Sequence, residues 1–533
     1  MPGKLKLTKE EKLLIRPFFT NLTRPVYCIL FLGPEITGAL CSRASRSKDD
    51  LRVIFLKEFV KPFLKTSYGK KFKKFSNFLQ KINYQRIFLN PRARKFYAKW
   101  LAQYGDDSIL QMAGTHIVFN SISQIAIKHF ENQRIGISAI ERSTRYVLLE
   151  ENLNKRLYYI PEELKNEKPK YIEVMDEIFK TYRKISEVYF NWLKEKFNEK
   201  EIVLKTKVLD VTRAILPLSL LSQVAFYGNG QALEYLILRS LHHKLSEIRN
   251  LGRLAYKELL KVIPSFLRRI EKNEDYMEYL SKRETILRKV LKKIEWKKDS
   301  IKLNENVRLI EYDKFAQEKI IASLIYPLVK EPFERIFEKV KRMKIKEKEK
   351  ILESILSSRK FRWYKVPRAF ESAFLRFEII SSIGAWRDLQ RHRMQTQFNE
   401  KFHIYNGYEI PEEIKEIKMD STFMMAIEKL EELYRILEKK DQDIAQYSVS
   451  FAHKIRFIQY QNLREFFWET ELRTTPQGHP EYRLIEQEKA KIILRLFPLI
   501  GKYLLVDFNK YEFPRRDQDE VIKKKIKEIL KHG

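Results

Sequence analysis

The chain contains few of the residues that cross-link or interrupt a fold. Its 533 residues include two cysteines, 15 glycines and 18 prolines. Cys28 and Cys41 provide no disulfide framework and no zinc-ligand spacing, and neither lies in a motif that would hold a reactive thiolate. We therefore expect no metal site and no cysteine nucleophile. The scarcity of glycine, together with apolar residues at helical spacing, predicts a helix-rich protein.

Long apolar runs are missing as well. The segment YCILFLG, residues 27 to 33, is far shorter than the ~20 residues of a membrane helix. The N-terminal sequence MPGKLKLTKEEKLL has no apolar region of the signal-peptide type. These absences predict a cytoplasmic protein without a membrane segment.

Negative charge is scarce relative to positive charge. Lys and Arg number 104 against 70 Asp and Glu, which gives a net charge of +34. Much of the excess lies in mixed runs such as KVKRMKIKEKEK, residues 339 to 350, which are typical of solvated helix faces. The alternative is attraction to polyanions, either phosphorylated substrates or nucleic acid. Both interpretations stay open.

The chain has enough apolar material for several domains. A hydrophobic content of 44% excludes global disorder, and the length predicts two to four domains at roughly 100–200 residues each. Residues 156–197 carry a long amphipathic pattern that predicts a helix, and THIVFNSISQIAI, residues 115 to 127, predicts a strand that enters a helix. Residues 271–305 are dense in charge and predict a helical connector.

An internal repeat organises the chain. RSLHHKLSEIR, residues 239 to 249, and RTTPQGHPEYR, residues 473 to 483, both place Glu eight positions after Arg and a second Arg two positions later. Asn229 and Asn462 precede these segments at nearly equal distances. The repeat predicts a first domain over 1–272, a charged helical connector over 273–305 and a second domain over 306–533. We expect Glu247–Arg249 and Glu481–Arg483 to form structural salt bridges between helices.

The first copy carries a spaced set of hydroxyl, acidic and basic residues. The pattern S-x-x-E-x-S-x-R-Y is formed by Ser138, Glu141, Ser143, Arg145 and Tyr146. His116 opens an H-x-x-F segment before it, and Asn229, Gln231 and Arg239 follow later. Arginine forks bind phosphate bidentately, and a serine hydroxyl adds a donor without bulk. The set is therefore suited to holding a phosphorylated ligand.

The second copy carries a different part of the same pattern. QRHRMQTQFNEKFH, residues 390 to 403, contains Arg391-His392-Arg393, where the first copy has Gln133-Arg134-Ile135. Thr396 stands for Ser138, Lys401 and His403 stand for Ser143 and Arg145, and we place Ser372 at the position of His116. Further on come Arg456, which we place on a helix, and then Asn462, Arg464 and Arg473.

Together these motifs resemble the flavin-dependent thymidylate synthases, whose pattern is R-H-R-x-x-S-x-x-E-x-S-x-R-Y with a later N-x-R. The resemblance covers most of both halves. It implies a helix-rich α+β fold of two tandem domains, each a small sheet flanked by helices. It also implies that the flavin cofactor is held by Arg391, His392, Arg393, Asn462, Arg464 and His116. The substrate ligands that it implies are Ser138, Glu141, Ser143, Arg145, Arg239, Arg456 and Arg473.

The function implied by the resemblance is methylation of deoxyuridylate at C5 to give thymidylate. The cofactor would be FAD, with methylenetetrahydrofolate and NADPH as co-substrates and dUMP or another uracil nucleotide as substrate. Because the two copies keep complementary residues, we expect a composite inter-domain site. We also expect a homo-oligomer, in which two fused pairs correspond to the tetramer of the family.

Two other functions are compatible with the same residues. The first is flavin-dependent methylation of uracil in RNA or DNA, which the basic composition favours. The second is a non-catalytic descendant that binds flavin or nucleotide, which the incomplete motif in each copy favours. The interpretation that we prefer is the thymidylate synthase-like enzyme.

Overall fold

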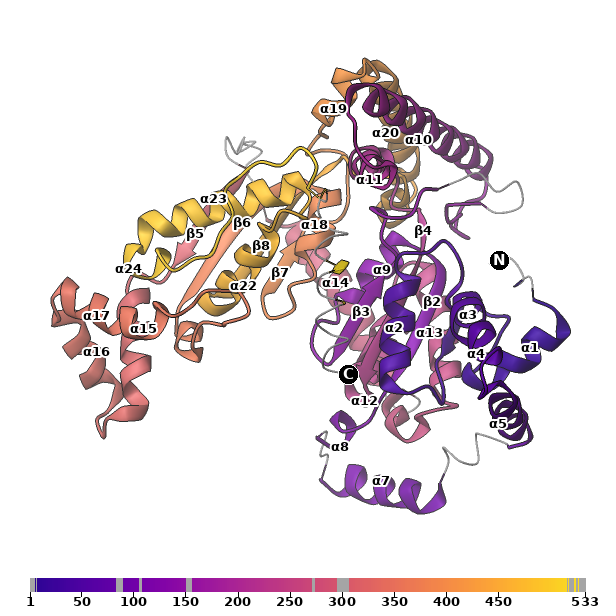
Figure 1. Cartoon of the computed structure of the whole chain (residues 1–533), viewed down its shortest axis with the longest axis horizontal. Helices are drawn as coiled ribbons and strands as arrows, with labels where there is room; N and C mark the ends of the chain where they lie inside the picture. Colours follow the sequence, from indigo (N-terminus) through magenta and orange to yellow (C-terminus); the bar gives the residue numbers. More distant parts are fainter. Residues whose placement is uncertain are drawn as a thin grey trace. The chain divides into compact units, whose positions relative to one another are not determined.

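The structure is a computed structural model of the chain, and it divides into two compact units (Figure 1). It describes residues 5, 7–82, 90–104, 108–149, 156–270, 274–294, 306–514, 516, 522, 523 and 526. Each unit is helix-rich and contains one small antiparallel sheet. The predicted fold class, two α+β domains that each have a small sheet flanked by helices, is confirmed.

Each unit includes a segment from the other half of the sequence. The first unit comprises Met1–Glu187, Ile215–Asp299 and Met419–Ser450, and the second comprises Val188–Ala214, Ser300–Lys418 and Phe451–Gly533. The units therefore differ from the contiguous division at 1–272 and 306–533. Two helical segments, residues 188–214 and 419–450, are exchanged between the halves.

The sheet of the first unit has four strands in the order β1-β2-β4-β3. Its central pair, β2 and β4, is antiparallel with a bulge between Asn120 and Ile122, where Ser121 has a φ of 57°. Val118, Phe119, Val224 and Phe226 are buried in this pair. The strands are β1 (Val26–Cys28), β2 (Gly114–Ser123), β3 (Ile137–Glu141) and β4 (Leu221–Asn229).

The sheet of the second unit repeats this topology in the order β5-β6-β8-β7, again antiparallel throughout. Along β6 and β8 buried residues alternate with more exposed ones, as expected for strands with one face on a core. The strands are β5 (Val307–Tyr312), β6 (Phe374–Ser382), β7 (Thr396–Asn399) and β8 (Lys454–Asn462).

Helices follow the strands in the same order in both repeats. In the first, α9 follows β2, and α12 and α13 follow β4; in the second, α18 follows β6, and α22 and α23 follow β8 (Figure 1). The segment 115–127 is confirmed as a strand that enters a helix. The predicted long helix within 156–197 is α10, and the helical part of the connector is α14.

The helices of the first unit are α1 (Lys9–Ile15), α2 (Pro34–Ala44), α3 (Leu51–Ile54), α4 (Lys61–Leu64), α5 (Gly69–Lys81), α7 (Pro91–Tyr104), α8 (Ser108–Gln111), α9 (Gln124–Glu131), α10 (Lys168–Lys196, as far as Glu187), α12 (Gly230–Leu241), α13 (Ser246–Leu259), α14 (Glu274–Leu291), α20 (Asp420–Glu438) and α21 (Gln442–Ala445). Those of the second unit are the end of α10, α11 (Glu201–Thr212), α15 (Ala316–Ile325), α16 (Phe333–Arg342), α17 (Ile345–Leu356), α18 (Ile383–Leu389), α19 (Glu412–Glu416), α22 (Leu463–Arg473), α23 (Pro480–Leu496) and α24 (Pro498–Gly501).

A serine and a glutamate join two helix starts in each repeat, and we call this the Ser–Glu clamp. Ser123 caps α9, and its backbone N–H and its hydroxyl donate to Glu247 of α13 at 2.8 and 2.6 Å. Ser382 caps α18, and the same two groups donate to Glu481 of α23 at 2.7 and 2.5 Å. The repeated Glu positions therefore mark a shared structural contact.

The expected salt bridges of these glutamates are replaced by hydrogen bonds, because Glu247 and Glu481 accept from the serines of the Ser–Glu clamp. Arg249 donates to the carbonyl oxygen of His243, and Arg483 donates to the carbonyl oxygen of Thr474 at 3.0 Å. Each arginine thus satisfies the backbone that precedes its helix. The salt bridges were expected between helices, but the contact that joins the two helices of each repeat is the Ser–Glu clamp, and Arg483 pairs at 3.7 Å with Asp507, which lies outside the helices.

We expect Glu247→Gln to remove part of the pH dependence of unfolding. Burial raises the pKa of Glu247 from 4.5 to about 7. The folded state therefore binds this proton more tightly than the unfolded state, and the free energy of unfolding falls as the pH rises from 4.5 to about 7. Urea unfolding across this range should show a shallower fall for the glutamine variant, and an unchanged slope would contradict the assignment.

Glu247→Ala is the matched comparison. It leaves two donors of Ser123 and the hydroxyl of Tyr447, which donates to Glu247 at 2.8 Å, without their acceptor. Each buried donor that stays unpaired costs about 1–3 kcal/mol. The alanine variant should therefore lose stability at every pH, whereas the glutamine variant should not.

Candidate functional site

The motif residues on the first sheet meet at one tyrosine of the central strand β4. His116 of β2 and Ser138 of β3 both lie opposite Tyr227 in the strand register. The ring centroids of His116 and Tyr227 are 4.9 Å apart. Burial lowers the pKa of His116, which favours the neutral imidazole.

The second sheet has the same arrangement around Tyr460 of β8. Arg376 of β6 and Thr396 of β7 lie opposite this residue, and the Arg376 guanidinium is 4.8 Å from the Tyr460 ring centroid. Thr396 is thus the register equivalent of Ser138. The expected equivalence of Ser372 and His116 is wrong, because Ser372 ends a 3₁₀ turn before β6 and Arg376 occupies the position.

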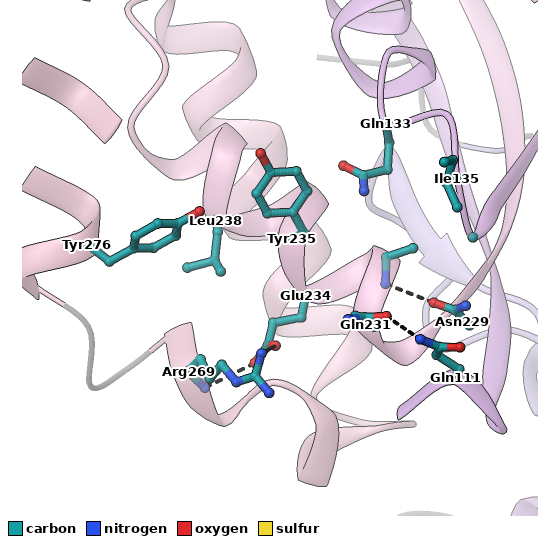
Figure 2. Close-up of a pocket in the computed structure, with 12 residues that line it drawn as sticks. Gln111, Gln133, Ile135, Asn229, Gln231, Glu234, Tyr235, Leu238, Arg269 and Tyr276 are labelled. Carbon is teal, nitrogen blue, oxygen red and sulfur yellow. Dashed lines mark hydrogen bonds and ion pairs between the residues drawn. The ribbon is translucent and has the colours of Figure 1, made fainter. Parts of the chain in front are cut away.

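A cavity of about 510 Å³ opens in the first unit beside the start of α12 (Figure 2). The positions that hold Arg391, Arg393 and Arg464 in the second repeat are Gln133, Ile135 and Gln231 here, and all three line the cavity. The remaining lining residues are Gln111, Gly136, Asn229, Ala232, Glu234, Tyr235, Leu238, Arg269 and Tyr276.

Amide groups dominate the polar part of the cavity. Gln111 Nε2 donates to Gln231 Oε1 at 2.9 Å, and Asn229 Oδ1 accepts from the backbone N–H of Ala232 at 2.9 Å (Figure 2). Gly136 has a φ of 76°, and a Cβ atom there would lie 2.9 Å from Ala232 Cβ. This glycine therefore lets the loop before β3 approach the start of α12 closely.

The charges that line the cavity are balanced. Glu234 accepts from the backbone N–H of Arg269 at 3.1 Å, and its carboxylate is 3.8 Å from the Arg269 guanidinium (Figure 2). Burial raises the pKa of Glu234 to about 7. A pyrophosphate needs cationic donors in excess, so the phosphate-bearing part of FAD does not fit these residues.

The residues that sequence analysis assigns to the substrate have different settings in the first unit. Ser143 Oγ accepts from the backbone N–H of Arg145 at 3.2 Å, and both side chains are partly exposed. Glu141 is buried and its carboxylate lies 3.1 Å from Lys128 Nζ. Arg239 donates to Gln133 Oε1 at 3.3 Å. Glu141 thus supports the core, while Ser143 and Arg145 lie nearer the surface.

In the second unit, Arg391-His392-Arg393 lies against α22. The two arginines are exposed, whereas His392 is 5% exposed. Arg473 Nε donates to His392 Nε2 at 2.8 Å, and Glu465 lies 3.2 Å from His392 Nδ1. Because arginine is always a donor, His392 Nε2 must accept its hydrogen bond. Nδ1 therefore carries the ring proton and donates a hydrogen bond to Glu465. The imidazole is therefore fixed in orientation and tautomer.

The N-x-R pair stands at the start of the same helix. Asn462 caps α22 by accepting from the backbone N–H of Glu465 at 2.9 Å. Arg464 donates to the carbonyl oxygen of Val366 at 3.1 Å and pairs with Glu371 at 2.7 Å. The structure thus brings Arg391, His392, Arg393, Asn462, Arg464 and Arg473 together around α22.

A buried ionic cluster supports this region. Lys489 of α23 lies 3.0 Å from Glu469, 2.9 Å from Glu486 and 2.8 Å from the amide oxygen of Gln459. The three charged side chains have no exposed surface. Burial raises the pKa of Glu486 to about 8, and the adjacent Glu469 adds to the shift. Lys489 is therefore matched by one ionised glutamate near neutral pH.

Arg456 belongs to a separate group of side chains. The expectation that it lies on a helix is wrong, because it lies in β8 and faces Glu400 at 3.8 Å. Glu400 also accepts from Asn406 at 2.8 Å and lies 3.2 Å from His403 Nε2. His403, the counterpart of Arg145, is thus occupied with an acidic neighbour that the first copy does not have at that position.

The residues around α22 fit the phosphate-bearing end of FAD. Exposed Arg391 and Arg393 flank an imidazole of fixed orientation, and guanidinium groups bind phosphate oxygens bidentately. Sequence reasoning missed Glu465 and the Lys489 cluster that hold this arrangement. The spacing of Glu465 could have been noticed in the sequence. Glu465 stands three residues after the capping Asn462, where the glutamate of a capping box is found.

The described residues provide no metal site, no membrane-spanning helix and no reactive cysteine. Within them, no three His, Cys, Asp or Glu side chains are grouped as metal ligands, and no helix is long and apolar enough to cross a bilayer. Cys28 and Cys41 are buried. Burial raises the pKa of Cys41 to about 11 and raises the pKa of Cys28 also. Neither thiol is therefore poised to act as a nucleophile.

Comparison with known families gives a match over most of the chain. A family model described as thymidylate synthase complementing protein matches residues 57–265 and 308–499. The two matched segments contain the β2–β4 pair and the β6–β8 pair respectively. The match thus covers both repeats.

Several known proteins are similar to this chain. A UPF0159 protein of Chlamydia muridarum is 32% identical over 527 residues, covering 96% of this chain and 98% of the relative. A UPF0159 protein of Thermoplasma acidophilum is 29% identical over 530 residues, covering 92% and 98%. The solved structure of the UMP/dUMP methylase PolB from Streptomyces cacaoi, bound with 5-Br dUMP, is 14% identical with a TM-score of 0.30. That alignment covers 37% of this chain and 93% of the other.

We expect Lys489→Met to destabilise the second unit strongly. The substitution leaves Glu469 and Glu486 together without their cation in a fully buried setting. Removing one partner of a buried ion pair costs about 3–5 kcal/mol. Chemical unfolding followed by circular dichroism would measure this loss.

The matched control is Lys491→Met on the same helix. Lys491 pairs with Glu488 at 2.7 Å, but both side chains are about half exposed. An exposed pair contributes about 0–1 kcal/mol. Equal losses in the two variants would show that the Lys489 cluster does not carry the stability assigned to it.

Proposed function

This chain belongs to the thymidylate synthase complementing protein family, and on that premise we propose that it methylates the C5 position of a uracil nucleotide, namely deoxyuridylate. The observation that carries the proposal is the arrangement around α22. Arg391 and Arg393 are exposed on either side of His392, which Glu465 and Arg473 hold in one orientation. That arrangement suits a phosphorylated cofactor.

The proposed cofactor is FAD, held by Arg391, His392, Arg393, Asn462 and Arg464. When bound, the flavin supplies the hydride that converts a methylene group into a methyl group, with methylenetetrahydrofolate as donor and NADPH as reductant. The protein itself has to position the two ligands and neutralise their phosphates. His116 is the proposed contribution of the first repeat to the cofactor.

The proposed substrate ligands come from both repeats. Ser143 and Arg145 of the first repeat would bind the phosphate of deoxyuridylate, since a guanidinium and an adjacent hydroxyl suit a dianion. The second repeat has Lys401 and His403 at those positions, and His403 faces Glu400 at 3.2 Å. We therefore propose that one reaction uses the cofactor residues of the second repeat and the phosphate residues of the first.

No protein nucleophile is needed in this scheme. The two buried thiols are consistent with that, because the raised pKa of Cys41, about 11, keeps it protonated near neutral pH. The direct test is to incubate the purified chain with deoxyuridylate, methylenetetrahydrofolate, FAD and NADPH and to assay for thymidylate. Absence of product together with absence of bound FAD would refute the proposal.

We expect Arg391→Ala and Arg393→Ala each to weaken FAD binding about 10- to 150-fold. A hydrogen bond to a charged group contributes about 1.5–3 kcal/mol, and each variant removes a guanidinium from the proposed pyrophosphate site. Quenching of flavin fluorescence on titration with the protein would give the dissociation constants.

The control is Arg335→Ala on α16, whose side chain is 78% exposed and pairs with Glu331. This variant has the same charge change and should bind FAD as the unaltered chain does. If all three variants lose affinity equally, the effect comes from net charge and the cofactor assignment fails.

We expect Arg145→Ala to weaken the binding of one ligand, deoxyuridylate, and not that of the other, FAD. It should weaken binding of deoxyuridylate about 10- to 150-fold, because it removes a charge-assisted hydrogen bond to the phosphate, while the affinity for FAD stays unchanged. Equilibrium dialysis with deoxyuridylate, using the FAD-loaded chain, measures the first quantity. Unchanged affinity for deoxyuridylate would remove the first repeat from the substrate assignment.

A further inference from the structure

An aromatic and basic segment, residues 359–365, lies beside α22 in the second unit and exposes three aromatic side chains. The rings of Phe361 and Trp363 are stacked with centroids 4.5 Å apart and an interplanar angle of 4°. Trp363 is 60% exposed, Phe361 45% and Tyr364 47%. Large aromatic side chains are seldom left in water together, so this surface suits a ligand with flat apolar faces.

The segment is braced against the unit and is not a loose loop. The side chain of Arg359 is 5% exposed and forms a bidentate ion pair with Glu471 of α22. Its Nε also donates to the carbonyl oxygen of Tyr364 at 2.5 Å. Arg464 donates to the carbonyl oxygen of Val366 at 3.1 Å. These contacts hold the backbone on both sides of the stacked rings before any ligand arrives, which lowers the entropic cost of binding.

The surroundings of the rings are positively charged. Residues 357–370 contain five Lys or Arg and no Asp or Glu. Lys360 and Lys365 are exposed, and Arg362 and Lys365 lie over the ring of Trp468 at 5.7 and 5.2 Å. Cations placed around an exposed aromatic stack favour a ligand that combines planar rings with negative charge.

We propose that this surface binds single-stranded nucleic acid. A base stacks on the outer face of the Phe361–Trp363 pair, and the adjoining phosphates lie against Lys360, Arg362 and Lys365. A duplex hides its base faces within the helix, so the stacked rings select a single strand. An acidic protein would pair with the lysine and arginine side chains, but it would offer no planar bases to stack on the aromatic rings.

This inference is independent of the proposed methylation, because it uses none of the cofactor residues as ligands. It does have a consequence for that function. Since Arg464, the second residue of α22, donates to the carbonyl oxygen of Val366 directly after the segment, a strand held on Trp363 passes near the proposed cofactor residues. A uracil within a polynucleotide is then a substrate that the same unit could present for reaction.

The test is binding of the full chain to a fluorescent oligodeoxythymidylate of about 16 nucleotides, the upper end of the usual site size. Fluorescence anisotropy should show binding, and Trp363→Ala should weaken it about 5- to 150-fold, the loss expected for one stacked base. Trp363→Phe should retain most of the affinity, because it keeps a stacking face. The oligonucleotide should quench part of the tryptophan emission of the unaltered chain, and this quenching should be smaller in both variants because they lack the Trp363 indole.

Two controls define what would overturn the inference. Tyr326→Ala removes another aromatic side chain of the same unit, 52% exposed and outside the segment, and should leave binding unchanged. Arg362→Gln combined with Lys365→Gln should reduce the slope of log affinity against log salt by about 0.7 per lost phosphate contact. Equal affinity of Trp363→Ala and the unaltered chain overturns the inference. A Trp363-dependent interaction with duplex DNA, anionic vesicles or a second copy of the chain, without one to the single strand, overturns it as well.

Discussion

The junction between the central strand and the following helix sets the position of equivalent motif residues in both repeats. Asn229 and Asn462 each end that strand, and each side chain accepts from the backbone N–H three residues later at 2.9 Å. Such a cap contributes about 1 kcal/mol and fixes where the helix begins. The residue two positions after the cap, Gln231 or Arg464, therefore projects from an equivalent place on either sheet. The Ser–Glu clamp fixes the other strand-to-helix junction of each repeat in the same way.

On this common backbone the two repeats present different chemistry. Around the first cap, Gln133, Ile135 and Gln231 line a cavity. The two charged residues of its lining, Glu234 and Arg269, pair with each other. Around the second, exposed arginines flank a buried histidine that two further side chains orient. Backbone positions alone therefore do not determine the ligand. An amide at one of these positions and a guanidinium at the equivalent position give the first cavity balanced charge and the second surface a cationic donor, which is the group that binds phosphate bidentately.

Sequence reasoning was most successful where local spacing carries the signal. The helix-rich character, the strand-to-helix segment at 115–127 and the equivalence of Thr396 with Ser138 follow from periodicity and motif spacing, the α+β class follows from the family resemblance, and the structure contains all four. It failed where strand register decides, since Arg376 and not Ser372 lies opposite Tyr460. It also could not foresee the exchanged segments 188–214 and 419–450, because which unit a helix packs on depends on tertiary contacts and not on its own pattern.

The distribution of kept and lost residues follows from what each one costs to lose. Changing a clamp glutamate or a capping asparagine leaves backbone donors unpaired, so any repeat that must fold retains it. Arg391 or Ser143 lies nearer the surface, and losing such a side chain costs the fold little. With two copies in one chain, a ligand-binding residue can disappear from one repeat as long as the other supplies it. If the proposed composite site holds, complementary loss of ligand groups on two intact backbones is the expected outcome of duplication under a requirement for both folding and function.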